Sequence, residues 1–133
     1  MSDKLELSPF VVTVNSEKTI EYFRDRPLNQ QQLADLAATD NKLNLGISIA
    51  GEFIEHPNDQ DKAIFIANIL VNALDSDDEA AIAVACAYLA TRYIHLKQLK
   101  ITNHDDRVSI ELINDQLYAE PIPIKFIPKK DLL

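Results

Sequence analysis

The sequence predicts an α+β fold in which a helical body precedes a small antiparallel sheet. Two strongly apolar helical segments, at about 60–74 and 77–97, are separated by only two residues, so we expect them to form an αα-hairpin. Apolar and polar residues alternate from about 99 to 127, as in half-buried strands. A β-branched run near the N-terminus predicts a strand that can join this sheet. Because no repeat or linker divides the chain, residues 1–133 are expected to form one domain.

Local composition predicts the N-terminal strand and a short helix after it. Phe10–Val14 has four β-branched residues after an aromatic one, a composition that is enriched in strands. Asn15 and Ser16 carry side-chain oxygens that can cap the first free N–H groups of a helix. Such a helix would end near Arg26, because Pro27 disfavours the helical conformation of the residue before it. We therefore expect this strand to be followed by a short helix.

A second helix is expected over about 30–39, and the segment after it fits two patterns. Asn29 and Gln32 have the spacing of a capping box, which marks a helix start. In the segment 42–56, apolar residues alternate as in a strand, but they also recur at the spacing of one helix face. Two glycines would weaken that helix by about 1 kcal/mol each. Helical patterns flank the segment on both sides, so we favour the helix.

The two helices of the αα-hairpin are the strongest predictions. Asn58 can start the first helix, and Ser76 with Glu79 has capping-box spacing for the second, which runs to about Lys97. The interior of the second helix is mostly alanine, which allows close approach of another helix. Burying the large apolar residues of the first helix would contribute roughly 10–20 kcal/mol before entropy is counted. They lie around nearly its whole circumference: Ile64, Phe65, Ile66, Ile69, Leu70, Val71 and Leu74.

The C-terminal part is expected to form the sheet. Residues 100–102 begin a strand, and 107–112 alternates polar and apolar residues after a turn. The last strand is expected over 117–127. Pro121 and Pro123 lie two residues apart, so their missing N–H groups fall on the same lateral edge. This strand is therefore expected to pair on one side only, as an edge strand does.

Charge and composition exclude several classes of protein. The net charge of −8 argues against direct binding to nucleic acid or to anionic lipid, which needs Lys and Arg. Most of the imbalance lies in residues 40–85, which hold nine acids and two lysines, whereas 86–104 holds three bases and no acid. No apolar stretch is long enough to span a bilayer. The first 25 residues carry five acids and no long apolar run, so we expect a cytoplasmic protein.

The sequence offers no catalytic constellation, and we expect no cofactor. Cys86 lies among alanines in the middle of a helix, where a thiol acts as a small apolar group. The acids and the histidine between the two possible helices are weak metal candidates, because the Glu-x-x-His pattern of a carboxylate-bridged site occurs without a second copy. If 50–56 is helical, three of them share one face. These candidates are Glu52, Glu55, His56, Asp59 and Asp61.

The pattern favours a non-enzymatic small acidic interaction module, such as an adaptor, an immunity or antitoxin-like protein, or a chaperone. It would present an acidic surface to a protein partner, and a basic partner would be attracted to it. The candidate contact residues are Asp75, Asp77, Asp78, Glu79, Tyr88 and Arg92. One alternative is a protein that binds a small molecule or a metal, and this alternative includes an enzyme. Its pocket would lie between the αα-hairpin and the sheet. Either Tyr88, Arg92 and His95 or the cluster of acids and histidine between Glu52 and Asp61 would lie at its mouth. A further alternative is a homo-oligomeric structural subunit, for example a homodimer.

Overall fold

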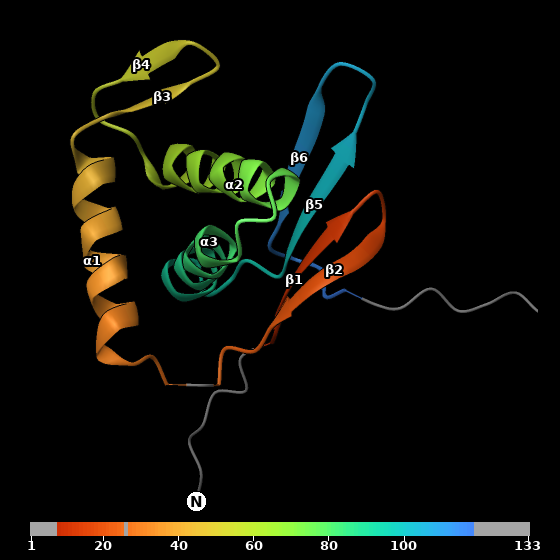
Figure 1. Cartoon of the computed structure of the whole chain (residues 1–133), viewed down its shortest axis with the longest axis horizontal. Helices are drawn as coiled ribbons and strands as arrows, with labels where there is room; N and C mark the ends of the chain where they lie inside the picture. The colour runs from red at the N-terminus through yellow and green to blue at the C-terminus, as the bar shows by residue number, and fades with distance from the viewer. Residues whose placement is uncertain (1–7, 26, 119–133) are drawn as a thin grey trace, which may run out of the picture.

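The structure, a computed structural model, describes residues 8–25 and 27–118 and has an α+β fold. The helices α2 and α3 lie between a four-stranded sheet and α1, and a small hairpin of two strands stands beside the helices (Figure 1). In chain order the elements are β1 (Phe10–Val14), β2 (Glu17–Tyr22), α1 (Gln30–Asn44), β3 (Ile47–Ile49), β4 (Glu52–Ile54), α2 (Asp59–Asp75), α3 (Glu79–Arg92), β5 (Gln98–Asn103) and β6 (Val108–Ile113).

The four-stranded sheet is mixed and has the order β2-β1-β5-β6. β1 pairs antiparallel with β2, and β5 pairs antiparallel with β6. The central pair is parallel, with Val11 opposite Gln98. The two described C-terminal strands therefore pair antiparallel as expected, and the N-terminal strand joins them as a parallel neighbour of β5. The parallel direction is possible because the helices form the long crossover between β1 and β5.

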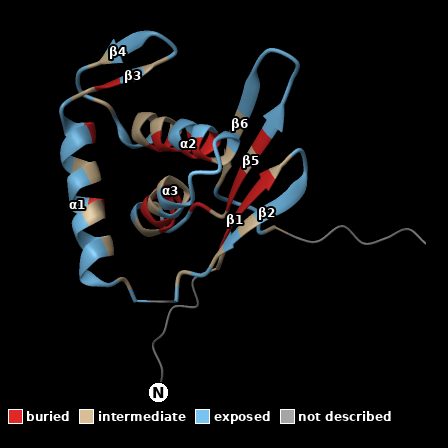
Figure 2. Cartoon of the chain, in the orientation of Figure 1, coloured by how far each residue is buried: buried red, intermediate tan, exposed pale blue. Residues whose placement is uncertain are grey.

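The hydrophobic core lies between one face of the sheet and the helices α2 and α3 (Figure 2). Side chains from β1, β5, α2 and α3 are excluded from solvent there, including Phe10, Val12, Leu70, Leu89 and Leu99 at 0% exposure. α2 contributes most of its apolar residues to this core, as expected for a helix that is apolar around most of its circumference. Within the described residues, no helix is long and apolar enough to cross a membrane.

Three of the expected helices are present, and two of them start at the expected caps. Asn29 Oδ1 accepts a hydrogen bond from the N–H of Gln32 at 2.8 Å, and the side-chain oxygen of Gln32 accepts one from the N–H of Asn29 at 2.9 Å. The same reciprocal arrangement joins Asn58 and Asp61 at the start of α2. The capping signals therefore identified both helix starts correctly. α1 continues to Asn44, five residues beyond the expected end at 39.

The helix expected after Asn15 is wrong, because this segment is the strand β2. Asn15 and Ser16 both have positive φ, at 52° and 72°, as the two central residues of a type I′ hairpin turn do. The chain reverses at this turn, and Glu17–Tyr22 pairs with β1. Side-chain oxygens at positions 15 and 16 fit a tight turn as well as a helix cap, and the neighbouring apolar strand decides between them.

The helix favoured for 42–56 is also wrong, because α1 ends and the β3–β4 hairpin begins inside this segment. Gly46 has a φ of 103° and donates a hydrogen bond to the carbonyl oxygen of Leu43 at 3.1 Å, which ends the helix. Ala50 and Gly51 then form the hairpin turn, with φ values of 52° and 83°. A Cβ atom on Gly46 would lie 2.3 Å from Cζ of Phe53. Only glycine fits at this position.

The connection between α2 and α3 differs from the expected capping box at Ser76. Ser76 instead ends α2, and its hydroxyl donates to the carbonyl oxygen of Asn72. Asp77 follows with a φ of 53°, which is the left-handed conformation that commonly closes a helix. The residue after it, Asp78, caps α3 by accepting a hydrogen bond from the N–H of Ala81. One short loop therefore ends one helix and starts the next.

α3 ends at Arg92, five residues before the expected end at Lys97, and Arg24 holds the chain where it leaves the helix. The guanidinium of Arg24 donates to the carbonyl oxygens of Ala90 at 2.8 Å and Tyr93 at 3.0 Å, and to those of Ser8 and Leu96. The last carbonyls of a helix have no partner within it, and the guanidinium supplies one. Burial lowers the pKa of Arg24 below its ordinary value.

The last predicted strand, over 117–127, falls mostly outside the described residues. Leu117 and Tyr118 are described and are not part of a strand. Pro121 and Pro123, on which the edge-strand prediction depends, lie outside the described residues.

Candidate functional site: the two ends of the helical hairpin

The first candidate site is the loop between α2 and α3, which we call the acidic loop. It consists of Asp75, Asp77, Asp78 and Glu79, and all four side chains are exposed. Among residues 8–25 and 27–118, no lysine, arginine or histidine lies within ion-pair distance of any of them. The loop therefore presents four carboxylates within five positions, unneutralised by the part of the chain that is described.

Two of these four carboxylates stabilise the fold and two do not. Asp78 caps α3 with a hydrogen bond of 3.2 Å, and Glu79 lies in the first turn of that helix, where the helix dipole favours negative charge. Asp75 lies in the last turn of α2, where the same dipole disfavours it and no basic residue is present. Asp77 has the left-handed backbone that glycine adopts at lower cost.

The carboxyl-terminal end of α3 carries a cluster formed by Asp40, Tyr88 and Arg92. The hydroxyl of Tyr88 donates to Oδ1 of Asp40 at 2.6 Å, and Nη2 of Arg92 donates to Oδ2 at 2.6 Å. Nε of Arg92 adds a longer bond of 3.3 Å to Oδ1. Tyr88 is only 3% exposed. The cluster therefore fastens α1 to α3, and it brings together Tyr88 and Arg92, the two candidate contact residues on that helix.

The protonation of this cluster is fixed by its geometry. Burial acts to raise the pKa of Asp40, but the hydrogen bonds from Tyr88 and Arg92 and the charge of Arg92 outweigh it, so that pKa lies below its usual value. Burial and the bond to Asp40 raise the pKa of Tyr88. The hydrogen bond to Asp40 raises the pKa of Arg92. No member of the cluster is placed to exchange a proton near neutral pH, which argues for a structural clamp.

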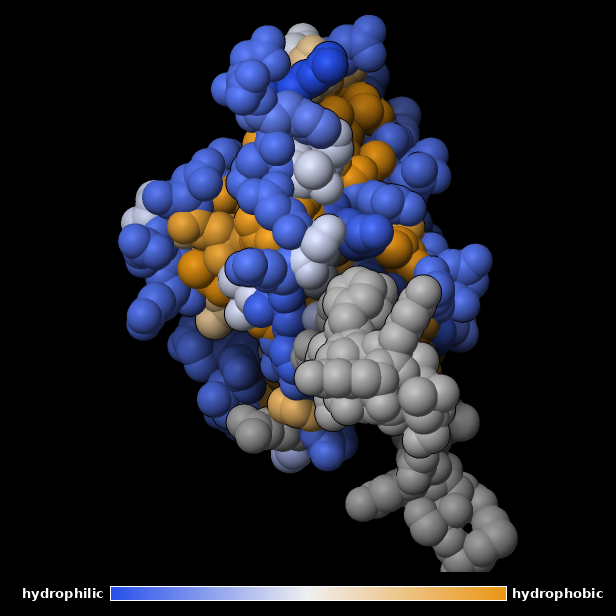
Figure 3. Space-filling view, turned by 90° about the vertical axis from the view of Figure 1, so that its right-hand side faces the viewer, coloured by the Kyte–Doolittle hydropathy of each residue, from blue (hydrophilic) through white to orange (hydrophobic). Residues whose placement is uncertain are grey.

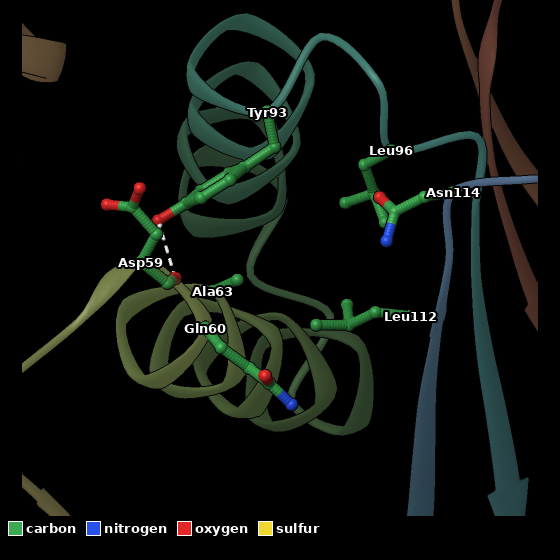
Figure 4. A pocket seen from close by; sticks show the side chains of 7 residues that line it. All are labelled: Asp59, Gln60, Ala63, Tyr93, Leu96, Leu112 and Asn114. Atoms are coloured by element: carbon green, nitrogen blue, oxygen red, sulfur yellow. Dashed lines mark hydrogen bonds between the residues drawn. The ribbon is translucent and has the colours of Figure 1, made fainter.

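The second candidate site is a cavity of about 300 Å³ between the αα-hairpin and the sheet (Figure 4). We call it the β6 pocket. Its apolar floor is formed by Ala63, Leu96 and Leu112, and its rim is polar. The hydroxyl of Tyr93 donates to the carbonyl oxygen of Asp59 at 3.1 Å, which ties the end of α3 to the start of α2. The lining residues are Asp59, Gln60, Ala63, Tyr93, Leu96, Leu112 and Asn114.

The pocket lies where the small-molecule hypothesis places one, and Asp59, from the second set of expected mouth residues, lines it. Tyr88, Arg92 and His95 do not line it. Tyr93 does, and burial, with smaller contributions from the charges of Asp59 and Asp40, raises the pKa of Tyr93 to about 12. The hydroxyl of Tyr93 therefore stays protonated at neutral pH and serves as a hydrogen-bond donor.

The weak metal candidates lie on different elements. Glu52 is on β4, Glu55 and His56 follow it in the connection to α2, and Asp59 and Asp61 are in the first turn of that helix. The helix face expected to join the first three does not exist, because β3 and β4 form a hairpin. Within the described ranges, no group of three His, Cys, Asp or Glu side chains is arranged to hold a metal ion.

Cys86 lies in the core, where α3 packs against the rest of the molecule. It is 2% exposed, and burial raises the pKa of its thiol to about 12. A thiol that remains protonated and shielded is a poor nucleophile. The structure thus places Cys86 as the sequence predicts, as a small apolar side chain in the helix interior.

The sequence offered no signal for Arg24 or for Asp40, which hold the two sides of α3. Each of them contacts residues that are distant along the chain, and a local spacing pattern in the sequence cannot predict contacts of this kind. Comparison with protein-family models, curated proteins and solved structures found nothing that matches this chain. The function of this chain is therefore inferred from the geometry of its candidate sites.

Large apolar side chains that reach solvent are spread over many elements. On the face seen in Figure 3, hydrophilic and hydrophobic areas are interleaved. The two most exposed are Leu45 at 80% and Phe53 at 65%, both near the β3–β4 hairpin. The others are Phe23, Leu33, Ile69, Ile94, Val108 and Leu117. In the described part of the chain, no single helix or strand gathers these exposed apolar side chains.

Proposed function

We propose that this protein is a non-enzymatic interaction module that presents the acidic loop to a basic surface on a protein partner. The observation that carries the proposal is the placement of Asp75 and Asp77 at positions where a carboxylate stabilises neither helix. Departures from local preference are concentrated at functional sites, because elsewhere they only lower stability. Binding is the role that exposed, unpaired carboxylates in a loop can serve without a catalytic group beside them.

The charge of the whole chain supports this role. A net charge of −8 creates a long-range field that draws in a positive partner. Carboxylates at the tip of a helical hairpin concentrate this field where a partner can reach them. Such electrostatic steering raises the rate of association more than it slows dissociation. Self-association through the acidic loop would place like charges together, so we assign the loop to a different protein. We place the protein in the cytoplasm, where a free cysteine such as Cys86 stays reduced.

The first experiment identifies the partner. Gentle purification of the protein from its own source, followed by native mass spectrometry, should give a mass that exceeds 15.0 kDa by a second polypeptide. The association rate with this polypeptide is then measured at several salt concentrations. A mass of 15.0 kDa alone, or a multiple of it, would count against the proposal.

A charge-removal variant tests the loop itself. The variant Asp75→Asn, Asp77→Asn, Asp78→Asn removes three charges but keeps the fold, because asparagine caps helices and tolerates the left-handed backbone as well as aspartate does. We expect its association at low salt to be about tenfold slower and less dependent on salt. The matched control removes three exposed carboxylates elsewhere, at Asp25, Asp105 and Asp106. An equal effect of both variants would mean that net charge alone matters.

A second candidate function is the binding of a small molecule, and the β6 pocket favours it. Its volume of about 300 Å³ is at the lower limit for ligand sites, and an apolar floor with a few polar rim groups is typical of them. The same native mass measurement distinguishes the two functions. An excess of tens to hundreds of daltons on a single chain would support a small ligand instead of a protein partner.

A further inference from the structure

The strand β6 forms an edge of the four-stranded sheet in the described part of the chain, with β5 on one side. The carbonyl oxygens of Arg107 and Ile113 accept hydrogen bonds from residues on the β5 side, each at 2.8 Å. Backbone groups of alternate residues point to opposite sides of a strand. The N–H and C=O groups of Val108, Ile110 and Leu112 therefore point away from β5, toward the open edge.

This edge lacks the features that usually protect an edge strand. β6 pairs with β5 over six residues in unbroken register, and it contains no proline and one charged residue, Glu111. The opposite edge of the sheet differs, because β2 carries charged side chains at Glu17, Lys18 and Glu21 and its register shifts midway. Charges and irregular register hinder the pairing of an added strand. β6 is thus the more receptive of the two described edges.

The β6 pocket lies directly beside this open edge. Figure 4 shows β6 between β5 and the pocket, with the side chain of Leu112 directed toward α2. In an antiparallel pair, directly opposite residues place their side chains on the same face of the sheet. A residue that pairs with Leu112 would therefore direct its side chain to the helix side, over the apolar floor formed with Ala63 and Leu96.

The charges around the open edge of β6 indicate which polar side chains an added strand would carry. Glu111, on the outer face of β6, is exposed; Lys100 lies opposite it on β5, so an added strand would approach Glu111 from its other side. The residues that line the pocket in the described chain include Asp59 and no lysine, arginine or histidine. A segment whose outer side chains are basic would be attracted by Glu111, by Asp59 and by the net charge of −8. A second copy of the chain fits less well, because it would bring another net charge of −8 and would set one Glu111 near another.

We propose that β6 binds an extended segment of another protein by strand addition, and that this segment alternates apolar and basic residues. Its backbone would pair with Val108, Ile110 and Leu112, and one apolar side chain would enter the β6 pocket. Main-chain hydrogen bonds supply affinity in this mode of recognition, and side-chain pockets supply specificity. The pocket is lined by the start of α2 and the acidic loop follows its end, about 25 Å apart along a 17-residue helix, so the pocket is separate from the acidic loop of the proposed function.

The probe is the blocked peptide acetyl-KVKLKVK-amide, titrated into the ¹⁵N-labelled full-length protein. The residues of the peptide that pair with β6 are the same ones that face the pocket, namely valine and leucine. We expect saturable shifts of the amide signals of Val108, Ile110 and Leu112 and of the methyl signals of Leu96. N-methylation of valine and leucine removes the pairing donors and should weaken binding about tenfold. N-methylation of the lysines, on the outer edge, is the matched control and should change little.

Three variants of the protein test the same site while the peptide is kept unchanged. Proline at an edge strand is tolerated where its N–H would face solvent, so Val108→Pro should keep the β5 pairing and weaken peptide binding at least fivefold. Val108→Thr keeps both the N–H and the shape, and it should bind as the parent does. Ala63→Leu fills the floor of the pocket and should weaken binding by a similar factor. The Val108 pair decides the question if Ala63→Leu fails to fold.

The proposal is overturned by several results. One is the absence of shifts up to about 1 mM peptide, and another is equal binding of the two N-methylated peptides. Amide protection of Val108, Ile110 and Leu112 without peptide would also overturn it. Protection that falls on dilution would identify a second copy as the occupant, and protection independent of dilution would identify residues 119–133. A negative result for strand addition does not count against the proposed role of the acidic loop. That role is tested by Asp75→Asn, Asp77→Asn, Asp78→Asn, which does not alter the edge of β6.

Discussion

Arg24 binds the carboxyl end of α3 through Ala90: Nε donates to the carbonyl oxygen at 2.8 Å, across 66 positions of the sequence. The same guanidinium holds the residues that follow the helix, and it lies 5.8 Å from the ring centroid of Phe10. It meets the negative end of the helix dipole with a positive charge. One side chain from the loop after β2 therefore joins the N-terminal hairpin to the helical layer.

Replacement of Arg24 should destabilise the protein strongly. Lysine keeps the charge but loses the planar fork that reaches several carbonyls at once. We expect Arg24→Lys to lower the free energy of unfolding by about 2 kcal/mol, and Arg24→Met by about 3–4 kcal/mol, since unsatisfied carbonyls remain. Urea denaturation measures both. If the two variants unfold at the midpoint of the parent, the guanidinium does not hold the helix end.

Glycine at position 77 should stabilise the protein. Asp77 has a φ of 53°, and a side chain in this conformation costs about 1 kcal/mol relative to glycine. We expect Asp77→Gly to raise the free energy of unfolding by about that amount. Asp77→Ala removes the same charge without the backbone relief, so it separates the two effects. An equal gain for alanine and glycine would show that charge repulsion, and not backbone strain, dominates in this loop.

A methyl group at Gly46 should destabilise the end of α1. Its Cβ would lie 2.3 Å from Cζ of Phe53, and the φ of 103° disfavours any side chain. We expect Gly46→Ala to cost about 2–3 kcal/mol in thermal or urea unfolding. Phe53 is 65% exposed, so Phe53→Ala alone should cost little. In the double variant the clash with the ring is gone, and the backbone cost of about 1 kcal/mol remains together with the approach to the carbonyl oxygen of Ile54 at 3.1 Å. Strictly additive effects would contradict this account.

The acid dependence of stability should report on Asp40. Its folded-state pKa lies below the usual value, so its clamp contributes fully above the unfolded value of about 3.9 and is lost as the pH falls through the folded value. We expect Asp40→Asn to be less stable than the parent at about pH 6, with the difference shrinking in strong acid. Urea midpoints of both proteins across this range test it. A difference that is constant with pH would mean that the clamp is not ionic.

Cys86 should not react with thiol reagents in the native protein. Burial raises its pKa to about 12, and both the thiolate and the path to it are absent in the folded state. An unfolded cysteine titrates near about 8.5, so labelling at about pH 8 should follow unfolding. We expect a disulfide reagent to react only as urea populates the unfolded chain. Fast labelling in native buffer would show that α3 opens locally.

The sequence predicted those parts of the fold in which neighbours along the chain decide the structure. The capping box at Asn29, the β-branched strand at Phe10–Val14 and the apolar helix α2 all follow from local chemistry. The alternation of Val108–Ile113 also identified its strand. In each of these segments, local preference and tertiary packing agree.

The errors arose where local chemistry fits two structures. Asn15 and Ser16 suit a helix cap and a type I′ turn equally, and the pairing of β2 with β1 decides between them. The periodicity of 42–56 favoured a helix, although Gly46 ends α1 by its backbone conformation. The acids of the candidate site were identifiable from their spacing. The partners of Tyr88 and Arg92 were not, because Asp40 lies 48 and 52 positions away.

The parallel pairing of β1 with β5 has a consequence for synthesis on the ribosome. β1 can pair with β2 as soon as the first hairpin emerges, but its other side waits for the strand that contains Gln98, the partner of Val11. At about 5–20 residues per second, that wait lasts about 4–17 s. During it, the apolar strand Phe10–Val14 exposes an unpaired edge to solvent or to a chaperone. A slow codon tract before β5 would prolong this exposure, and faster elongation would shorten it.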